Sequence, residues 1–436
     1  MTTFLSMTRT GRALHRPGGV LAPVLGQVGG LASALALVMT SVLKSLLPPM
    51  PAPLLAKVLA KVPAKVPAAV LVAVLAAVLA AVLAAVLAAG PAAAAVGLSE
   101  IAATAQDGPV TVFYPSNAET RPTRRGFMTL DLAEQGMPVR GNGRLVVISH
   151  GTGGTPWVHS DLARSLVEAG FIVALPEHRA DHYKDHSDAP GALARRPGEV
   201  SRAIDALGRD SRFAALLQLD KVGVYGMSAG GHTALTLAGG RWSPAGFRDH
   251  CEAQIDHDFQ FCVGVITSLT GGMLDGFKKW MALQVIRQRF DDATVRSHHD
   301  PRIAAVVAAV PAAAIFDVAS LATPRVPLGL VTARQDRWLL PRFHSDRVLE
   351  ACRSCTLIAE LPDGGHGAYL SPLPPGLSGI LGDMLNDPPG FDRSVLPAVD
   401  AKVTAFLAGH LLGDAAPAGP VAAPDGAAPR AVSTAP

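Results

Sequence analysis

The sequence predicts an α/β fold in which helices cover both faces of a mostly parallel central sheet. Between residues 98 and 413, short runs of β-branched and apolar residues alternate with segments of helical spacing. Several runs are apolar throughout, which is typical of strands that are buried on both faces. Right-handed crossovers would then bring the turns that follow these strands together at the carboxyl edge of the sheet.

The strands are assigned from the short apolar runs and the helices from the helical spacing, in chain order. The run at 144–149 (RLVVIS), for example, is a continuous apolar stretch that ends in a glycine-rich turn. Strands are expected at 110–114, 144–149, 171–175, 222–225, 303–310, 327–332 and 356–360, and helices at 161–169, 197–207, 229–238 and 396–412.

Residues 239–302 interrupt the alternation. They hold Trp242, His250 and Trp280, and residues 277–290 have helical spacing. An insertion at this point of the chain would lie beside the carboxyl edge of the sheet, as a cap over a site there. The alternative is a surface elaboration that makes no contact with a substrate.

Charge is distributed unevenly along the 436 residues. Charged residues make up 17% of the chain, against roughly 25% in an average soluble domain. Seven of the 38 Lys and Arg residues, and none of the 35 Asp and Glu residues, lie in 1–98. The rest of the chain is therefore mildly acidic and lacks the basic surface of a nucleic-acid-binding protein. The abundance and clustering of apolar residues exclude a collagen-like or fully disordered chain.

Residues 1–97 have the pattern of a leader. An uncharged run at 66–96 contains the unit Val-Leu-Ala-Ala four times, after Lys57, Lys61 and Lys65 and before small residues. This pattern predicts a cleaved secretory signal, although the run is also long enough for an uncleaved membrane anchor. A low-complexity helix is the third interpretation. The first two predict an exported protein, which would meet a membrane only through an uncleaved apolar segment. The Ala/Pro-rich residues 414–436 are expected to be a disordered tail.

Four cysteines fit an oxidising compartment. Cys251 and Cys262 lie eleven positions apart, and Cys352 and Cys355 form a Cys-x-x-Cys pair. Either pair could close a disulfide, and the first is the stronger candidate. A zinc site would need about four ligands together, whereas these pairs lie far apart in the sequence, so no metal is expected.

The motif Gly226-Met227-Ser228-Ala229-Gly230 fits Gly-x-Ser-x-Gly. It lies between an expected strand and an expected helix, which is the setting that a nucleophile elbow requires. The alternative is a glycine-rich helix start with a capping serine. The context favours Ser228 as a nucleophile.

A serine hydroxyl needs a positioned base to accept its proton. His366 follows the strand expected at 356–360, and Asp336 follows the strand expected at 327–332. Along the chain, Ser228 comes first, then Asp336, then His366. This is the order expected for nucleophile, acid and base when a nucleophile elbow lies on such a sheet. Asp317 and Asp363 are lesser candidates for the acid.

The turn Ser149-His150-Gly151-Thr152-Gly153-Gly154 follows another expected strand. A turn here can direct a backbone N–H at a developing oxyanion, together with the N–H of the residue after the nucleophile. The expected donors are the amides of Thr152 and Ala229, while His150 is expected to brace the turn. No phosphate-binding glycine motif lies at a strand–helix junction, so a nucleotide cofactor is not expected.

With these motifs in this order, the chain resembles the α/β-hydrolases over residues 98–413. It is similar to the bacterial dienelactone-hydrolase-like group, which is related to platelet-activating-factor acetylhydrolases and cutinase-like polyesterases. The resemblance implies Ser228 as the acylated residue, Asp336 as the acid, His366 as the base, and the amides of Thr152 and Ala229 as oxyanion donors. Dienelactone hydrolases carry a cysteine where this chain has Ser228, which favours ordinary carboxylic esters as substrates.

The function expected from these residues is the hydrolysis of carboxylic esters through an acyl-enzyme, with no cofactor. Apolar residues near the motifs indicate a short-chain or hydrophobic ester. These candidate pocket residues are Trp157, Met227, Tyr369 and Leu370. The alternatives are hydrolysis of a lipid or polyester, acyl transfer at a membrane, or a non-catalytic binding scaffold.

Overall fold

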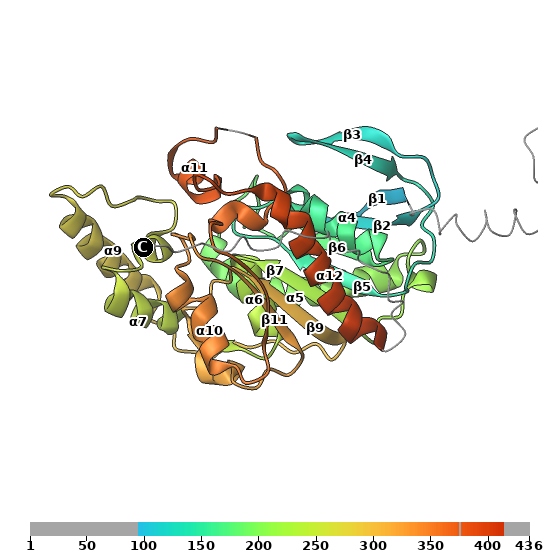
Figure 1. Ribbon diagram of the computed structural model, residues 1–436. Coiled ribbons are helices and arrows are strands. Elements are labelled where there is room, and N and C mark those ends of the chain that lie inside the picture. Colours follow the sequence, from blue (N-terminus) through green and yellow to red (C-terminus); the bar gives the residue numbers. More distant parts are fainter. Residues whose placement is uncertain (1–94, 375, 414–436) are drawn as a thin grey trace, which may run out of the picture. The chain divides into compact units, whose positions relative to one another are not determined.

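The computed structural model describes residues 95–374 and 376–413, which form one α/β unit (Figure 1). The expected class is confirmed, because the central sheet is mostly parallel and helices pack on both of its faces. The predictions of a signal or anchor at 66–96 and of a disordered tail at 414–436 concern residues outside the described part.

Within this part, ten strands form one sheet in the order β12-β11-β9-β7-β5-β6-β2-β1-β4-β3. The six strands from β12 to β6 are parallel, and β2 joins them antiparallel to β6. The strands are β1 (Ala95–Ile101), β2 (Val110–Ser116), β3 (Arg121–Arg125), β4 (Met128–Glu134), β5 (Leu145–Ser149), β6 (Ile172–Pro176), β7 (Val222–Met227), β9 (Ile303–Ala309), β11 (Leu328–Ala333) and β12 (Thr356–Leu361). A separate pair joins β8 (Arg241–Trp242) to β10 (Phe316–Asp317).

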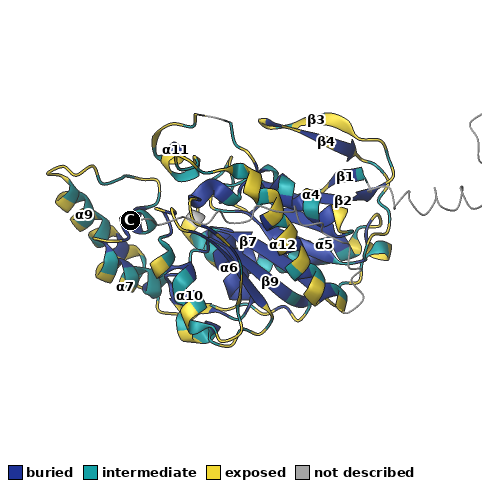
Figure 2. Ribbon diagram, in the orientation of Figure 1, coloured by how far each residue is buried: buried dark blue, intermediate teal, exposed yellow. Residues whose placement is uncertain are grey.

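Two layers of helices cover this sheet. One face packs against α4 (Ser160–Glu168) and α12 (Leu396–Leu412), and the other against α5 (Ala189–Arg209), α6 (Ala229–Leu237) and α10 (Ser345–Ala351). Figure 2 shows the buried strands between helices whose outer sides are exposed. The remaining elements are α7 (Pro244–Gln254), α8 (Phe259–Val263), α9 (Asp275–Arg289), α11 (Gly379–Leu385), and the short 3-10 helices η1 (Pro156–His159), η2 (Ala214–Leu216), η3 (Val318–Leu321), η4 (Pro341–Phe343), η5 (His366–Tyr369) and η6 (Arg393–Val395).

The order of the strands places the candidate site. After β5 the chain crosses to β6 on one side, and it then returns to β7 on the other side of β5. At such a reversal the turns that leave neighbouring strands diverge and open a crevice at the carboxyl edge. The turn after β5 and the turn that holds Ser228 after β7 therefore lie next to each other.

Several features differ from the sequence-based expectations. β1 begins at Ala95, so residues 95–97 belong to the sheet and not to the leader. α5 begins at Ala189 instead of 197, because the Asp188 side chain caps its start and the helix continues through Pro197. None of β1, β3 and β4 is among the strands expected from the sequence, and β3 (RPTRR) is an edge strand without an apolar stripe that pairs only with β4.

Residues 239–302 form a helical insertion of α7, α8 and α9 with a small core of its own, which includes Ile255, Phe259 and Ile286. A disulfide joins Cys251 of α7 to Cys262 of α8, and a second joins Cys352 to Cys355. Asp258 links the insertion to the rest of the unit, because it contacts His344 at 3.4 Å as well as His250 of α7 at 2.8 Å. The role of a cap over the site stays a prediction.

The half-buried carboxyl of Asp400 in α12 predicts a pH effect on stability. Burial, and then the nearby charge of Asp161 in α4, raise the pKa of Asp400 to about 7. The unfolded chain loses this proton near pH 4, so between about pH 4 and pH 7 the folded state binds more protons and stability falls as pH rises. Asp400→Asn should therefore raise the free energy of unfolding at pH 8 by about 1–2 kcal/mol, less than the full shift because water reaches the carboxyl.

Urea unfolding at pH 5 and pH 8 tests this expectation. The gain from Asp400→Asn should be larger at pH 8 than at pH 5, whereas Asp383→Asn, at an exposed position in α11, should leave stability unchanged at both. An equal effect of Asp400→Asn at the two pH values would contradict the prediction.

Candidate active site

Ser228 lies on a sharp turn between β7 and α6, in the centre of the parallel strands. Its backbone has φ 59° and ψ −117°, a conformation that costs free energy in a residue with a Cβ. The surrounding backbone holds it there: its N–H donates to Ala309 O at 3.0 Å, and its carbonyl accepts from Ala312 N at 3.1 Å. The side chain is half-buried, so the hydroxyl stands at the edge of the sheet rather than inside it.

Two glycines allow this turn to form. A Cβ at Gly226 would lie 1.9 Å from Gly230 O, and a Cβ at Gly230 would lie 1.9 Å from Ser149 O. Neither backbone oxygen can move aside without opening the strand–helix junction. The Gly-x-Ser-x-Gly spacing is therefore a steric requirement of the way α6 passes over β7 and β5.

The structure brings Ser228, His366 and Asp336 together. His366 Nε2 lies 3.1 Å from Ser228 Oγ, and His366 Nδ1 lies 2.7 Å from Asp336 Oδ2. His366 and Asp336 are only 5% and 1% exposed, whereas Ser228 is partly open. The three groups form one hydrogen-bonded chain from a buried carboxylate, through an imidazole, to an accessible hydroxyl.

Backbone amides fix the carboxylate of Asp336. Its Oδ1 accepts from Trp338 N and Leu339 N, each at 2.8 Å, which leaves Oδ2 for His366. Of the lesser candidates, Asp317 forms an ion pair with Arg241 at 2.9 Å, and Asp363 is exposed. Asp336 is the carboxylate that contacts His366.

The turn at 150–154, which we call the oxyanion loop, lies against Ser228. A Cβ on Gly151 would be 3.3 Å from Ser228 Cβ. Ala229 is the first residue of α6, so its N–H has no acceptor within the helix. Neither this amide nor that of Thr152 donates a hydrogen bond to any residue of the described part. Their role as oxyanion donors stays a prediction that this arrangement permits.

His150 braces the oxyanion loop. Its Nδ1 lies 2.7 Å from Gly151 O, and its Nε2 accepts from His178 N at 3.3 Å. Burial lowers the pKa of His150 well below its usual value, with a smaller effect from His178, so the ring is neutral in ordinary buffers.

The four candidate pocket residues differ in how far they are buried. Met227 and Leu370 are 2% and 6% exposed and belong to the core. Tyr369 donates its hydroxyl to Thr332 O at 2.7 Å, while half-buried Trp157 packs edge-on against Phe113. Their role in binding an acyl group stays a prediction.

A cavity of about 660 Å³ opens between the insertion and the segment after β9. Trp242, His250 and Phe316 line it, together with Arg241 and Arg347. None of Ser228, Asp336 and His366 lines this cavity. Over residues 95–374 and 376–413, no group of three or more His, Cys, Asp or Glu side chains is arranged to hold a metal ion.

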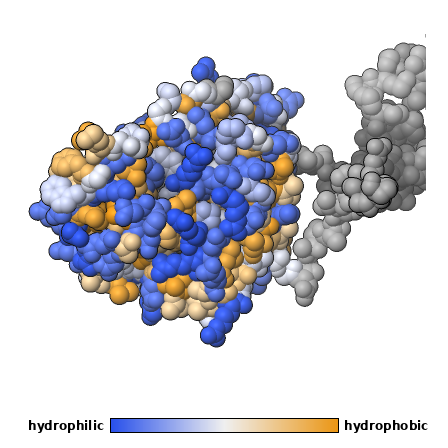
Figure 3. Space-filling model, turned by 60° about the vertical axis from the view of Figure 1, so that its left-hand side comes forward, coloured by the Kyte–Doolittle hydropathy of each residue, from blue (hydrophilic) through white to orange (hydrophobic). Residues whose placement is uncertain are grey.

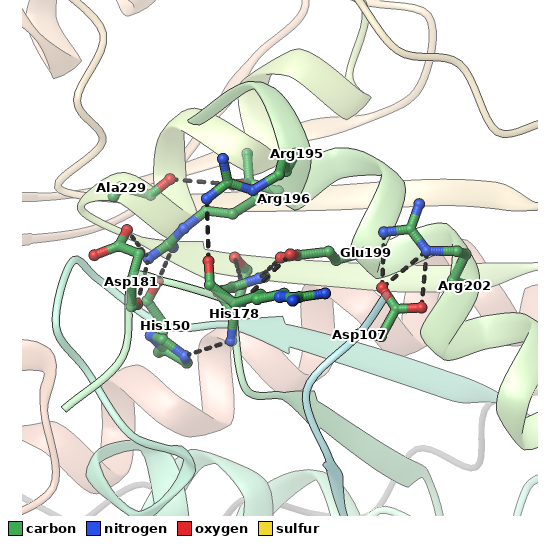
Figure 4. Close-up of polar contacts among 12 residues, drawn as sticks. Asp107, His150, His178, Asp181, Arg195, Arg196, Glu199, Arg202 and Ala229 are labelled. Carbon is green, nitrogen blue, oxygen red and sulfur yellow. Dashed lines mark hydrogen bonds and ion pairs between the residues drawn. The ribbon is translucent and has the colours of Figure 1, made fainter. Parts of the chain in front are cut away.

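Sequence reasoning missed a polar network beneath the oxyanion loop, which Figure 4 shows. Ser149 Oγ lies 2.7 Å from His178 Nε2, and His178 Nδ1 lies 2.6 Å from Glu199 Oε2. Arg196 and Asp181 form a second pair there, with no exposed side-chain surface. The sequence does indicate that Arg196 is buried. Its position has the helical spacing of the buried residues of α5, which are Val200, Ala203, Ile204 and Leu207.

Comparisons with known proteins add a distant likeness. No protein-family model matches the chain, and no curated protein matches it. A ferulic acid esterase from Streptomyces cinnamoneus is a similar solved structure, with 18% sequence identity and a TM-score of 0.48. The match covers 76% of this chain and 94% of that one.

Proposed function

We propose that this chain is an exported serine hydrolase of the α/β-hydrolase type that cleaves carboxylic esters through an acyl-enzyme. One observation carries the proposal: Ser228 Oγ, His366 and Asp336 form a continuous hydrogen-bonded chain in which only the serine is partly open. The strained elbow supports it, because such strain persists where the surrounding structure holds a reactive group in place.

The reaction follows from this geometry. His366 Nε2 takes the Ser228 proton as Oγ bonds to the ester carbonyl carbon, and the carbonyl oxygen becomes an oxyanion. The amides of Thr152 and Ala229 hold that oxyanion. When the tetrahedral intermediate collapses, the alcohol leaves with the proton from His366. Water, activated by His366, then releases the carboxylic acid and restores Ser228.

Two observations support the proposal of export. The sequence before the sheet has a basic, then apolar, then small-residue order that is typical of a secretory signal. All four cysteines are paired in disulfides, which persist in oxidising compartments.

A substrate at an apolar surface, such as a lipid or polyester, is the second candidate. Large apolar side chains on residues 265–285 of the insertion are exposed: Val265, Ile266, Met273, Leu274, Phe277, Trp280, Met281 and Val285. Figure 3 shows apolar patches among hydrophilic residues on one face of the molecule. Exposed apolar patches often mark surfaces that contact another protein, a membrane or a ligand.

A covalent probe tests the function directly. A fluorophosphonate should label the folded full-length chain on Ser228, as located by peptide mass spectrometry, and prior labelling should abolish hydrolysis of p-nitrophenyl esters. Activity across acyl lengths from acetyl to lauryl would size the acyl site. A clear preference for dispersed over dissolved long-chain ester would favour the surface substrate. Folded protein that is neither labelled nor active on any ester would refute the proposal.

A further inference from the structure

A fully buried ion pair lies beneath the oxyanion loop. Arg196 of α5 and Asp181, from the segment after β6, meet at 2.6 Å, and both side chains are inaccessible to solvent (Figure 4). Apolar residues of similar volume often stabilise a protein as well as a buried ion pair does, or better. A contribution to stability therefore does not explain why this ion pair is present. Its hydrogen bonds indicate a different role.

The pair holds three peptide groups of the oxyanion loop. Arg196 Nη1 donates to His150 O, and Nη2 donates to Gly151 O at 3.2 Å. On the other side, Asp181 Oδ1 accepts from Gly153 N at 3.0 Å. The planar guanidinium and the carboxylate together hydrogen-bond to the backbone of the loop from its buried side.

These contacts fix the direction of the Thr152 amide. In a trans peptide the C=O and the N–H point to opposite sides of the chain, so the Gly151 carbonyl determines where the Thr152 N–H points. That carbonyl faces Arg196 and also lies 2.7 Å from His150 Nδ1 and 3.1 Å from Gly154 N. The Thr152 N–H accordingly points away from the guanidinium. Gly151 itself lies against Ser228.

The backbone beside Asp181 is strained as well. Ala180 has φ 58°, a conformation that is rare for a residue with a Cβ, and its carbonyl accepts from Asp188 N at 3.1 Å. The segment therefore keeps an unfavourable conformation while it presents Asp181 to both Arg196 and Gly153.

We propose that Arg196, together with Asp181, is a positioning residue for the oxyanion hole: it holds the Gly151 carbonyl so that the Thr152 N–H stays directed at the oxyanion formed on Ser228. This inference rests on the proposed function. It adds a role for residues that touch neither the substrate nor the reacting atoms, and it predicts that their loss affects the transition state more than substrate binding.

Two substitutions and a matched control test the role. Arg196→Lys keeps a positive charge opposite Asp181 but cannot donate in fixed directions to two carbonyls. Arg196→Met removes the charge as well. Arg202→Gln is the control: Arg202 lies six residues further along α5 and pairs with Asp107 at 2.7 Å, away from the loop (Figure 4). Kinetics are measured on full-length protein, with active sites counted by fluorophosphonate labelling.

The expected result is a loss in kcat with little change in KM. Removing one oxyanion donor costs about 10²–10³-fold, so we expect about 10-fold to 10²-fold for Arg196→Lys and up to about 10³-fold for Arg196→Met. The inhibition constant of a trifluoromethyl ketone, which forms an oxyanion on the serine, should rise by a similar factor. Arg202→Gln should match the wild type in all three quantities. If Arg196→Met does not fold, Arg196→Lys alone decides.

Each contrary outcome has a definite meaning. An active, labelled wild type with an Arg196→Lys variant of unchanged kcat and ketone affinity would overturn the positioning role and leave the proposed function intact. A variant that only loses thermal stability, with full kcat per labelled site, would do the same, because that is the signature of a structural pair. A wild type that neither turns over nor reacts with the probe would overturn both proposals.

Discussion

Replacing Ser228 with alanine should lower kcat for ester hydrolysis by about 10⁶-fold, to a rate near the background of the assay. The reason is the loss of Ser228 Oγ, the atom that forms the acyl-enzyme in the proposed mechanism, because His366 and Asp336 are buried behind it. Fluorophosphonate labelling should disappear at the same time. The measurement is the initial rate with p-nitrophenyl acetate at saturating concentration.

The fold should survive this substitution. Alanine keeps the Cβ, so the backbone at φ 59° is strained to the same degree and the melting temperature should change little. Ser211→Ala, at an exposed position after α5, serves as the control and should retain full activity. A folded Ser228→Ala protein that hydrolyses esters at the wild-type rate would exclude the acyl-enzyme mechanism at this residue.

Asp336→Asn should lower kcat by about 10⁴-fold with the fold intact. An asparagine oxygen can still accept from Trp338 N and Leu339 N, so the amide NH₂ would take the place of Oδ2 opposite His366 Nδ1. Two donors would then face each other. The imidazole would adopt the other tautomer, with its proton on Nε2, and could no longer accept the proton of Ser228.

A variant of a neighbouring carboxylate separates this effect from a general loss of negative charge. Asp363→Asn removes an exposed carboxylate three residues before His366 and should leave kcat unchanged. A loss below 10-fold in a folded Asp336→Asn protein would show that Asp336 does not set the tautomer. Circular dichroism and the melting temperature of each variant provide the test of folding.

Much of the fold, and the grouping of Ser228, Asp336 and His366, could be predicted because short stretches of sequence mark each of them. Ser228 is marked by neighbours at fixed spacing, and a strand and a helix flank it directly. Asp336 and His366 each follow a strand that is apolar enough to recognise. Once parallel strands are assigned, all three side chains must lie at one edge of the sheet.

The parts that escaped prediction depend on contacts between distant segments. Arg196 and Asp181 belong to different elements, and only the assembled sheet brings both beneath the oxyanion loop. The edge strand β3 has no apolar stripe, because its pairing with β4 and not burial defines it. The helical spacing predicts a helix from residue 197, whereas α5 begins at Ala189, where the side chain of Asp188 caps it.

Among residues 95–374 and 376–413, two Ser–His–carboxylate series have hydrogen bonds of comparable length, and they differ in access to solvent. Ser149, His178 and Glu199 are almost completely enclosed, so no ester can approach that hydroxyl. The enclosed series is a natural reference for the open one, inside a single molecule. Any covalent probe must contact the hydroxyl that it modifies, so in the folded protein it can react with Ser228 but not with Ser149. Labelling of Ser228 without Ser149 would therefore show that a Ser–His–carboxylate arrangement confers no reactivity toward esters where a substrate cannot enter.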